Sequence, residues 1–362
     1  MIVCGAGIAG LAHACAVALQ GRRVVALERA PELREVGAGL QVAPNGGRVL
    51  DALGVHPPSL ESEAVHLIDG PSARPVLRMP LGPGFRLVHR ADLIAALRDA
   101  AVAAGVDLRL GQAVVGIDPA GAVTTEAGML HAPRIVGADG VRGLARRTVA
   151  PDHPSRFTGQ VAWRAVVPCP DDWPREAQVR MGPGRHLVIY PLPGGRLNLV
   201  GVEERAQWAE EGWSHRDDPG AFLRAFRGFG YVVRRLLERV EEVHLWGLMD
   251  HGVTPAWRDG AVTLIGDAAH PTLPFLAQGA NLALEDAWTL ARSDDPAAWE
   301  AMRRPRVERA LAAAAANARN YHLGGAARLG AHAALRAVGA VAPSAMGRRY
   351  RWLYDYDPIS ER

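Results

Sequence analysis

The feature that most constrains this chain is a glycine-rich turn close to its first residue. Residues 2–4 form a short apolar run, and the sequence Gly-Ala-Gly-Ile-Ala-Gly follows directly over residues 5–10. Residues 8–20 are apolar and rich in alanine, so they predict a helix that packs on a sheet. Gly21 predicts the end of that helix, and residues 24–27 predict a second buried strand. This order of strand, turn, helix and strand is typical of the first unit of a parallel α/β sheet.

Each glycine of this turn has its own geometric task. Gly5 permits the tight bend, Gly7 lets a pyrophosphate approach the backbone, and Gly10 allows close packing of the helix on the sheet. The amides at the start of the helix favour a phosphate, because they carry the positive end of the helix dipole. Glu28, at the end of the second strand, can accept hydrogen bonds from a ribose. Together with Glu28, the turn predicts a dinucleotide site.

Composition narrows the class of protein. The 362 residues predict two interlocked domains with sizeable cores. All 41 basic residues are arginines and they are scattered along the chain, so no clustered basic face for a nucleic acid is expected. Cys4, Cys15 and Cys169 are too few for a disulfide framework, and no histidine pair has the spacing of a metal site. We see no leader and no membrane span, so we expect a cytoplasmic protein.

The pattern of the strands changes along the chain. Residues 160–167 and 186–190 alternate in polarity and Gly194-Gly195 predict a turn, which is typical of antiparallel strands, and the apolar run 261–265 returns to the first pattern. We therefore predict an α/β fold in which a Rossmann-like cofactor domain contains an inserted, mostly antiparallel β-sheet substrate domain and ends in a C-terminal helical region. The expected bounds are 1–72, 88–150 and 256–320 for the cofactor domain, 73–87 for one strand of the substrate sheet, 151–255 for the substrate domain and 321–362 for the helical region.

A second group of small and polar residues follows the strand 261–265. Asp267 comes directly after that strand, where its carboxylate can accept a hydrogen bond from a ribityl hydroxyl. Residues 279–281 begin a helix whose amides can face an electron-rich ring. The alternative for Asp267 is an ordinary helix N-cap.

Together these segments resemble the class A flavin monooxygenases, the group of para-hydroxybenzoate and salicylate hydroxylases. The resemblance covers nearly the whole chain and implies a fold of the GR2 flavoprotein type. The stretches 186–192 and 274–279 are most similar to the salicylate, 3-hydroxybenzoate and 6-hydroxynicotinate branch. The other segments that carry the resemblance are 5–10 with 28–29, 37–41 with 44–45, 89–93, 137–140, 266–271 and 321–323.

The resemblance implies FAD as the cofactor, NADH or NADPH as a co-substrate without a domain of its own, and O2. Together they form a flavin C4a-hydroperoxide that hydroxylates a small aromatic substrate similar to hydroxybenzoate or salicylate. By the same resemblance, the residues that contact FAD are Gly5, Gly7, Gly10, Glu28, Arg29, Gln41, Arg90, Asp139, Asp267, Pro274, Gln278, Gly279, Ala280 and Asn281.

Hydroxylation of a phenol needs a base or a proton relay at its hydroxyl. His186 and Tyr190 are four residues apart on one predicted strand, so both face the same side, and they are the catalytic candidates. Pro274 is the third, placed at the reaction centre by the resemblance. The alternative for the first two is a solvated histidine and a half-buried strand aromatic. Arg185 and Arg196 are weaker candidates for binding a substrate carboxylate.

The chain departs from the family at two positions. Where hydroxynicotinate relatives carry a histidine that resembles the base, this chain has Gln41, which cannot accept a proton. Where the family usually has a serine after Asp139, this chain has Gly143, which weakens any prediction of nicotinamide contact there. His270 is expected to be structural, and Glu285 with Asp286 to complement a helix dipole.

Three other functions stay open at this stage. The chain could act on a larger natural product by epoxidation or oxidative tailoring, or it could be a flavin reductase that does not use O2. It could also be a flavoprotein without catalysis. The sequence leaves open the substrate, the choice between NADH and NADPH, and the oligomeric state, a homodimer included.

Overall fold

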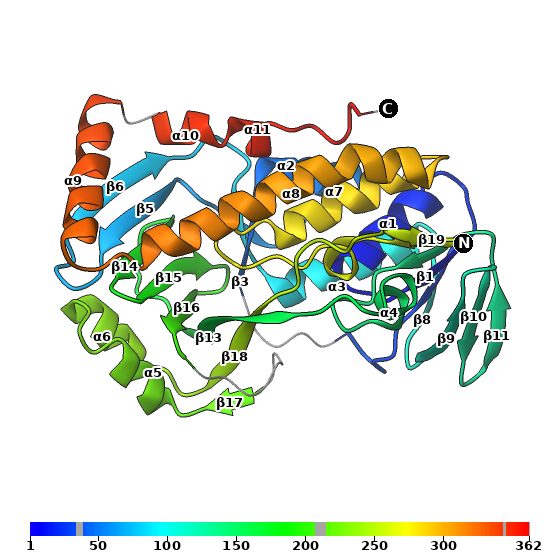
Figure 1. Cartoon of the computed structure of the whole chain (residues 1–362), viewed down its shortest axis with the longest axis horizontal. Helices are drawn as coiled ribbons and strands as arrows, with labels where there is room; N and C mark the ends of the chain where they lie inside the picture. Colours follow the sequence, from blue (N-terminus) through cyan, green and yellow to red (C-terminus); the bar gives the residue numbers. More distant parts are fainter. Residues whose placement is uncertain (34–38, 207–214, 343–344, 362) are drawn as a thin grey trace.

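The computed structural model describes residues 1–33, 39–206, 215–342 and 345–361. The strands in these ranges form sheets of six, eight, three and three strands. The six-stranded and eight-stranded sheets lie at opposite ends of the molecule, and the long helix α8 (Pro296–Tyr321) runs along both (Figure 1). Gly37 and Ala38, part of one segment that carries the resemblance, lie outside the described residues.

The six-stranded sheet brings together segments that are far apart in the sequence. Its order is β19-β20-β12-β1-β2-β8, and all neighbours are parallel except β19 and β20. This sheet confirms the Rossmann-like fold, because strands from three separate parts of the chain complete it. Its strands are β1 (Ile2–Cys4), β2 (Val25–Leu27), β8 (Asp107–Arg109), β12 (Ile135–Gly137), β19 (Arg258–Asp259) and β20 (Val262–Leu264).

Helix α1 (Ile8–Ala18) is buried along its whole length, which explains its many alanines. It packs between α3 (Arg90–Ala103) and α7 (Gly279–Ala291), and small side chains let these helices approach closely. Gly21 has a φ of 75°, so it ends the helical stretch in the left-handed conformation that glycine adopts without strain. The remaining helices of this half are α2 (Pro44–Ala52) and α4 (Leu144–Val149), with the 3-10 turn η1 (Gly266–Ala268).

The eight-stranded sheet is antiparallel except for the pairing of β14 with β5. This confirms the inserted, mostly antiparallel sheet. One face packs on α5 (Pro219–Ala225) and α6 (Tyr231–Leu237), where Trp163 stacks on Phe222. In sheet order its strands are β17 (His215–Asp217), β18 (Val243–Asp250), β13 (Arg156–Pro168), β16 (Arg196–Glu204), β15 (Arg185–Leu192), β14 (Glu176–Gly182), β5 (Ala64–Asp69) and β6 (Pro75–Pro80).

Two strands differ from the expected sheet membership. Strand β5 lies in the substrate sheet although residues 1–72 were assigned to the cofactor domain, because Leu67 packs with Val179 and Met181. Strand β6 lies in the eight-stranded sheet, as expected for the substrate strand 73–87, but the last residues of that range begin β7 (Arg86–His89), which pairs with β3 (Gly39–Val42) and β4 (Ser59–Glu61) in a small separate sheet. The other small sheet contains β9 (Val114–Asp118), β10 (Ala122–Thr125) and β11 (Gly128–His131).

A buried ion network joins α7 to α8. The guanidinium of Arg303 is fully buried and lies 2.7 Å from Glu285 Oε2 and 3.0 Å from Asp286 Oδ1. Asp286 also contacts His270 Nε2 at 2.5 Å, so His270 takes part in the same network. The interpretation of Glu285 and Asp286 as complements of a helix dipole is therefore wrong: both carboxylates lie beyond the first turn of α7 and compensate a buried cation.

The C-terminal helices cover one end of the eight-stranded sheet. Helix α9 (Gly325–Val341) packs on β6, and α10 (Ala345–Arg349) and α11 (Arg351–Tyr354) follow along the top of the molecule (Figure 1). The ring of Tyr354 meets that of Phe85 edge to face at 4.9 Å. Among the described residues, none of the helices combines the length and the apolar character needed to cross a bilayer.

Candidate active site

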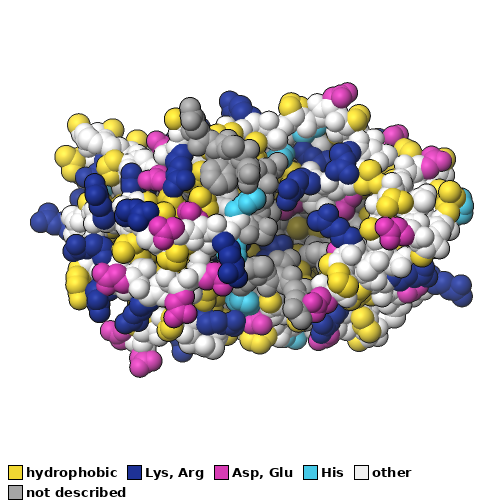
Figure 2. Space-filling view, turned by 90° about the horizontal axis from the view of Figure 1, so that it is seen from below, with side chains coloured by type: hydrophobic (Ala, Val, Ile, Leu, Met, Phe, Trp, Pro, Cys, Tyr) yellow, Lys and Arg dark blue, Asp and Glu magenta, His cyan; other side chains and the backbone are white. Residues whose placement is uncertain are grey.

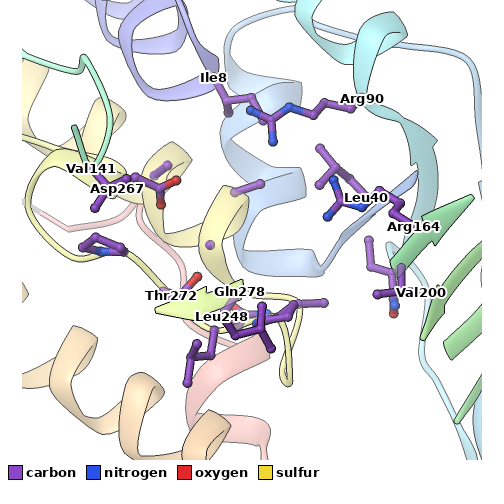
Figure 3. Close-up of a pocket in the computed structure, with 18 of the residues that line it drawn as sticks. Ile8, Leu40, Arg90, Val141, Arg164, Val200, Leu248, Asp267, Thr272 and Gln278 are labelled. Carbon is purple, nitrogen blue, oxygen red and sulfur yellow. The ribbon is translucent and has the colours of Figure 1, made fainter. Parts of the chain in front are cut away.

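A cavity of about 310 Å³ lies between the two large sheets. The start of α1, the turn η1 and the start of α7 form one side of it, and strands β15, β16 and β18 form the other. Figure 3 shows the labelled side chains surrounding one open space, with Asp267 and Arg164 on opposite sides. The face seen in Figure 2 is hollowed near its centre, and both basic and acidic side chains lie around the hollow.

The glycine turn brings the start of α1 to this cavity. A Cβ on Gly10 would lie 1.9 Å from the carbonyl oxygen of Gly5, so only glycine permits this approach. Gly5 itself has a φ of 102°, in the left-handed region. Gly7 differs from both, because a Cβ there would meet nothing within 4 Å. Gly7 and Ile8 border the cavity, so the amides that begin α1 face a space large enough for a ligand.

The carboxylate of Glu28 is hydrogen-bonded to the glycine turn. Its Oε2 accepts a hydrogen bond from the amide of Ala6 at 2.8 Å, and its Oε1 accepts one from the amide of Ala30 at 3.0 Å. Each oxygen keeps a second lone pair for a ribose hydroxyl. Arg29 is exposed beside it, whereas Arg90 borders the cavity on the side of Ile8. The expected contacts of Glu28, Arg29 and Arg90 with a cofactor stay predictions.

The second side of the cavity ends at the start of α7. Gly279 and Ala280 border it, and the first turn of α7 has neither a side-chain cap nor an acidic residue. The positive end of this helix dipole therefore faces the cavity. Just before it, Ala277 has a φ of 52°, a strained conformation for a residue with a side chain. Asp267 exposes its carboxylate to the cavity between the two helix starts.

Two of the residues expected to contact the cofactor also fix the position of α7 through their side chains, and their contact with a cofactor stays a prediction. Asn281 is fully buried, and its side chain accepts from the amide of Ala43 at 2.9 Å and donates to the carbonyl of Gln41 at 3.1 Å. Gln278 borders the cavity, but its Oε1 accepts a hydrogen bond from Asn45 Nδ2 at 3.0 Å. Both side chains hold α7 against β3 and α2. The bond from Asn281 to the carbonyl of Gln41 also fixes the position of Gln41 in the cavity wall.

Asp139 turns away from the cavity. Its Oδ2 accepts a hydrogen bond from the amide of Ala145 at 2.8 Å, at the start of α4, and burial raises the pKa of this carboxyl to about 6. A Cβ on Gly143 would lie 1.9 Å from Asp139 Oδ1. In this conformation the carboxylate occupies the space beside Gly143, so a side chain at this position would require Asp139 to move. A contact of Asp139 with FAD or nicotinamide stays a prediction.

His186 and Tyr190 both border the cavity from β15, on the same face as predicted. Both are buried, and burial lowers the pKa of His186 well below its ordinary value and raises that of Tyr190. The Nδ1 of His186 lies 2.7 Å from His322 Nε2, which leaves Nε2 of His186 for a bound molecule. Tyr190 packs beneath Gly39, where a Cβ would lie 2.8 Å from its hydroxyl oxygen.

A second cavity, of about 350 Å³, lies behind the first. The wall between the two cavities consists of the residues that border both, Gln41, His186, Val188, Pro274 and Ala277. The far side of the second cavity is lined by apolar residues of β5 and β14 and by both polar and apolar residues of the helices, Asn317, Asn320 and His332 among the polar ones. Pro274 thus lies beside His186, where the resemblance placed the reaction centre, although no contact in the structure assigns it a chemical role.

The sequence reasoning missed Arg164. This side chain comes from β13, borders the cavity, and has its guanidinium carbon 4.7 Å from the ring centre of Trp246. The two arginines that were considered instead lie elsewhere: Arg185 pairs with Glu203, and Arg196 pairs with Asp92. The signal was present, because Arg164 is the inward-facing position after Ala162 on the predicted strand 160–167.

The two helix starts make the cavity suitable for a long dinucleotide. A pyrophosphate fits at α1, where glycines leave the backbone bare, and an electron-rich ring fits at the amides of α7. Asp267 lies between them with an exposed carboxylate that can accept from a polyhydroxyl chain. These residues fit FAD.

Comparisons with known proteins agree with this geometry. Residues 1–293 match the family described as FAD binding domain. The chain is 36% identical to 3-amino-4-hydroxybenzoate 2-monooxygenase from Streptomyces cremeus, with 89% of this chain and 87% of that protein covered. It is also 36% identical to 3-hydroxybenzoate 6-hydroxylase 1 from Aquipseudomonas alcaligenes, over 80% and 79%. A salicylate hydroxylase structure, with its substrate, superposes with a TM-score of 0.80 at 24% identity, over 99% and 95%.

Valine at Gly7 tests the dinucleotide site without disturbing the fold. The backbone there is extended (φ −77°, ψ −169°), and a side chain would point into open space. We expect Gly7→Val to raise the Kd for FAD by about tenfold or more, about 1.4 kcal/mol, because the side chain occupies the place of the pyrophosphate. Fluorescence titration of the flavin measures this effect.

Gly228→Val is the matched control, since a Cβ at Gly228 also meets nothing within 4 Å. Both variants should keep the melting temperature of the FAD-free protein. A Gly7→Val protein that binds FAD as tightly as the wild type would contradict this assignment of the site.

Proposed function

The chain belongs to the FAD binding domain family, within the class A flavin monooxygenases, and we propose that it hydroxylates a small aromatic acid that carries a phenolic hydroxyl. NADH or NADPH supplies the electrons and O2 the oxygen atom. One observation carries this proposal: a buried histidine and an arginine border the same cavity, opposite the helix start that suits a flavin ring. The relatives named for hydroxybenzoates support the substrate class.

FAD, when bound, accepts a hydride and activates O2 for transfer of one oxygen atom to the ring, while the other leaves as water. The chain would hold it by Gly7 and Ile8 at the pyrophosphate, Asp267 at the ribityl chain, and the amides of Gly279 and Ala280 at the ring. The start of α7 favours negative charge on the ring system, because its dipole presents the positive end there.

His186 is the residue best placed to activate the phenol. Burial lowers the pKa of its ring, so the imidazole is neutral near pH 7 and Nε2 can accept a proton. A phenolate is a better nucleophile than a phenol, because its negative charge is shared with the ring carbons that are attacked. Tyr190, whose pKa is raised by burial, stays protonated and can donate a hydrogen bond to the same oxygen.

Arg164 gives the cavity a preference for acids. Its guanidinium lies on the sheet side of the cavity, where it can form two hydrogen bonds with a substrate carboxylate. The surrounding side chains from β15, β16 and β18 are apolar, including Val188, Val200 and Leu248. Such walls exclude water and strengthen the ion pair. A ring that carries both a carboxylate and a hydroxyl therefore satisfies Arg164 and His186 together.

Substrate-dependent oxidation of the nicotinamide tests the proposed function. The FAD-loaded protein is mixed with NADH or NADPH and a panel that contains salicylate, hydroxybenzoates, aminohydroxybenzoates and hydroxynicotinates. We expect one or more of the phenolic acids to accelerate oxidation. Under ¹⁸O2, the product should gain one labelled oxygen atom by mass spectrometry. A flavin that is reduced but gives no labelled product with any member of the panel would defeat the proposal.

Arg164→Gln tests the selection of acids. Loss of a charge-assisted hydrogen bond should weaken binding of the best phenolic acid by about 1.5–3 kcal/mol, which is about tenfold to a hundredfold in Kd. Binding of the matching phenol without a carboxylate should stay unchanged, as measured by quenching of the flavin fluorescence. Arg196→Gln serves as the control, because its side chain pairs with Asp92 outside the cavity. Equal losses for acid and phenol would show that Arg164 only supports packing.

A further inference from the structure

A row of three polar side chains leads from the cavity wall to the surface. His186 Nδ1 lies 2.7 Å from His322 Nε2, and His322 Nδ1 lies 2.8 Å from Glu204 Oε1. The first two rings are buried, whereas the side chain of Glu204 is 55% exposed. The three residues come from β15, the end of α8 and β16, so elements from separate parts of the chain contribute one residue each.

We propose that His322 and Glu204 carry the phenol proton from His186 to solvent. This inference rests on the proposed function, because it concerns the proton that an aromatic substrate releases in the cavity. It adds two residues that act through His186 and touch neither the substrate nor the cofactor, so both are positioning and relay residues.

The hydrogen bonds assign one proton to each ring. Glu204 is a carboxylate and can only accept, so His322 carries its proton on Nδ1 and donates it to Glu204 Oε1. The Nε2 of His322 is then an acceptor, and His186 donates its Nδ1 proton to it. His186 consequently has a bare Nε2 on the cavity side, which is the state that a base requires.

Transfer of one proton through this row balances at every atom. The phenol O–H bond breaks as a new N–H bond forms on His186 Nε2, and the Nδ1 proton of His186 moves to His322 Nε2. The Nδ1 proton of His322 moves to Glu204, whose exposed carboxyl releases it to water. Both rings end in the opposite tautomer, and exchange in the reverse direction restores them after the product leaves.

His186 cannot keep the proton by itself. Burial lowers the pKa of His186 and, to a smaller extent, the neighbouring His322 lowers it as well. Burial therefore disfavours the charged ring, and the contact with His322 gives His186 a partner to which it can pass the proton. Burial also lowers the pKa of His322, and Glu204 opposes this by stabilising the charged form.

The other described groups that face the rings of His186 and His322 do not offer the proton a path to solvent. Arg185 on β15 bears a positive charge, which opposes a proton on His322, and Tyr321 on α8 contacts the ring of His186 with a pKa raised by burial. Gln160 on β13 is a neutral amide, and its Nε2 lies 3.4 Å from His322 Nδ1, farther than Glu204. Phe275 completes the surroundings of His186.

Tyr190 does not provide a second route. Its cross-strand neighbour on β16 is Asn198, which is fully buried and accepts a hydrogen bond from the amide of Gly39. An amide cannot pass a proton to solvent from there. The two residues expected to act as a pair on β15 thus have different surroundings, and only His186 connects to an exposed acid.

Backbone hydrogen bonds hold His322 and Glu204 in fixed positions relative to each other. Gly184, in the turn before β15, donates its amide to the carbonyl of His322 at 3.1 Å, and its own carbonyl accepts from the amide of Glu204 at 2.9 Å. Gly184 has a φ of 65°, a conformation that favours glycine. One glycine therefore fixes the distance between the second and third members of the row.

Ionisation of a coloured phenol in the oxidised, FAD-loaded enzyme tests the relay without turnover. The probe is 3-hydroxy-4-nitrobenzoate, whose phenolate absorbs visible light, mixed in a stopped-flow instrument below the pKa of the free phenol and without nicotinamide. The wild type should form bound phenolate rapidly. Glu204→Gln and His322→Gln should slow this step by about tenfold or more, with a Kd for the probe within about twofold of the wild type.

Two controls separate a lost relay from lost structure. Glu203→Gln removes the neighbouring carboxylate, which contacts Arg185 and Arg205 instead of a histidine, and should ionise the probe at the wild-type rate. Added acetate should restore the rate in Glu204→Gln, because a small carboxylate can take up the proton from His322 in place of the missing side chain. A structural defect would not respond to acetate.

The outcomes distinguish this inference from the function on which it rests. Fast ionisation in both Glu204→Gln and His322→Gln, or equal slowing in Glu203→Gln, would overturn the relay and leave aromatic hydroxylation standing. A wild type that binds the probe but leaves its phenol protonated would overturn the relay as well. Failure of the wild type to bind this probe or any phenolic acid of the panel would remove the proposed function and the relay with it.

Discussion

The close approach of α1 to the first strand is the constraint on which the rest of the structure depends. A single methyl group on Gly10 would collide with the carbonyl of Gly5, so the turn exists only with glycine at these positions. This approach brings the amides of α1 to the edge of the parallel sheet, where β12 and β20, from much later in the chain, complete the same layer. The cavity is therefore built at the carboxyl ends of parallel strands, where ligands of such sheets bind.

The second helix start is held in place by buried polar contacts. Asn281, Gln278 and Asn45 connect α7 to β3 and α2, and the ion network around Arg303 connects α7 to α8. Such groups are costly to bury unless each finds a partner, so they fix one arrangement of the helices and leave few others. The strained Ala277 lies at the junction, where the chain turns from the cavity wall into α7. Because these buried contacts hold α7 rigidly, the amides at its start have a defined position at the cavity.

Much of this architecture could be predicted from the sequence, because local patterns report it. The turn at residues 5–10, the alternation on β13 and β15, and the shared face of His186 and Tyr190 all follow from spacing. What the sequence could not reveal depends on contacts between distant segments. The membership of β5 in the substrate sheet, the burial of Glu285 and Asp286 beside Arg303, and the meeting of His186, His322 and Glu204 are of this kind. Gly143 was visible as an exception, but the proximity of the Asp139 carboxylate to it could be seen only in the structure.

The central claim is that one extended cofactor lies between the starts of α1 and α7 with its ring toward β15. The most direct measurement is a crystal structure of the protein with FAD bound. The account predicts the pyrophosphate at the amides of Gly7 and Ile8, the ribityl chain beside Asp267, and the ring system between the start of α7 and the wall that carries His186. A flavin that lies elsewhere, or a ring that is separated from His186 by the strand β3, would contradict it.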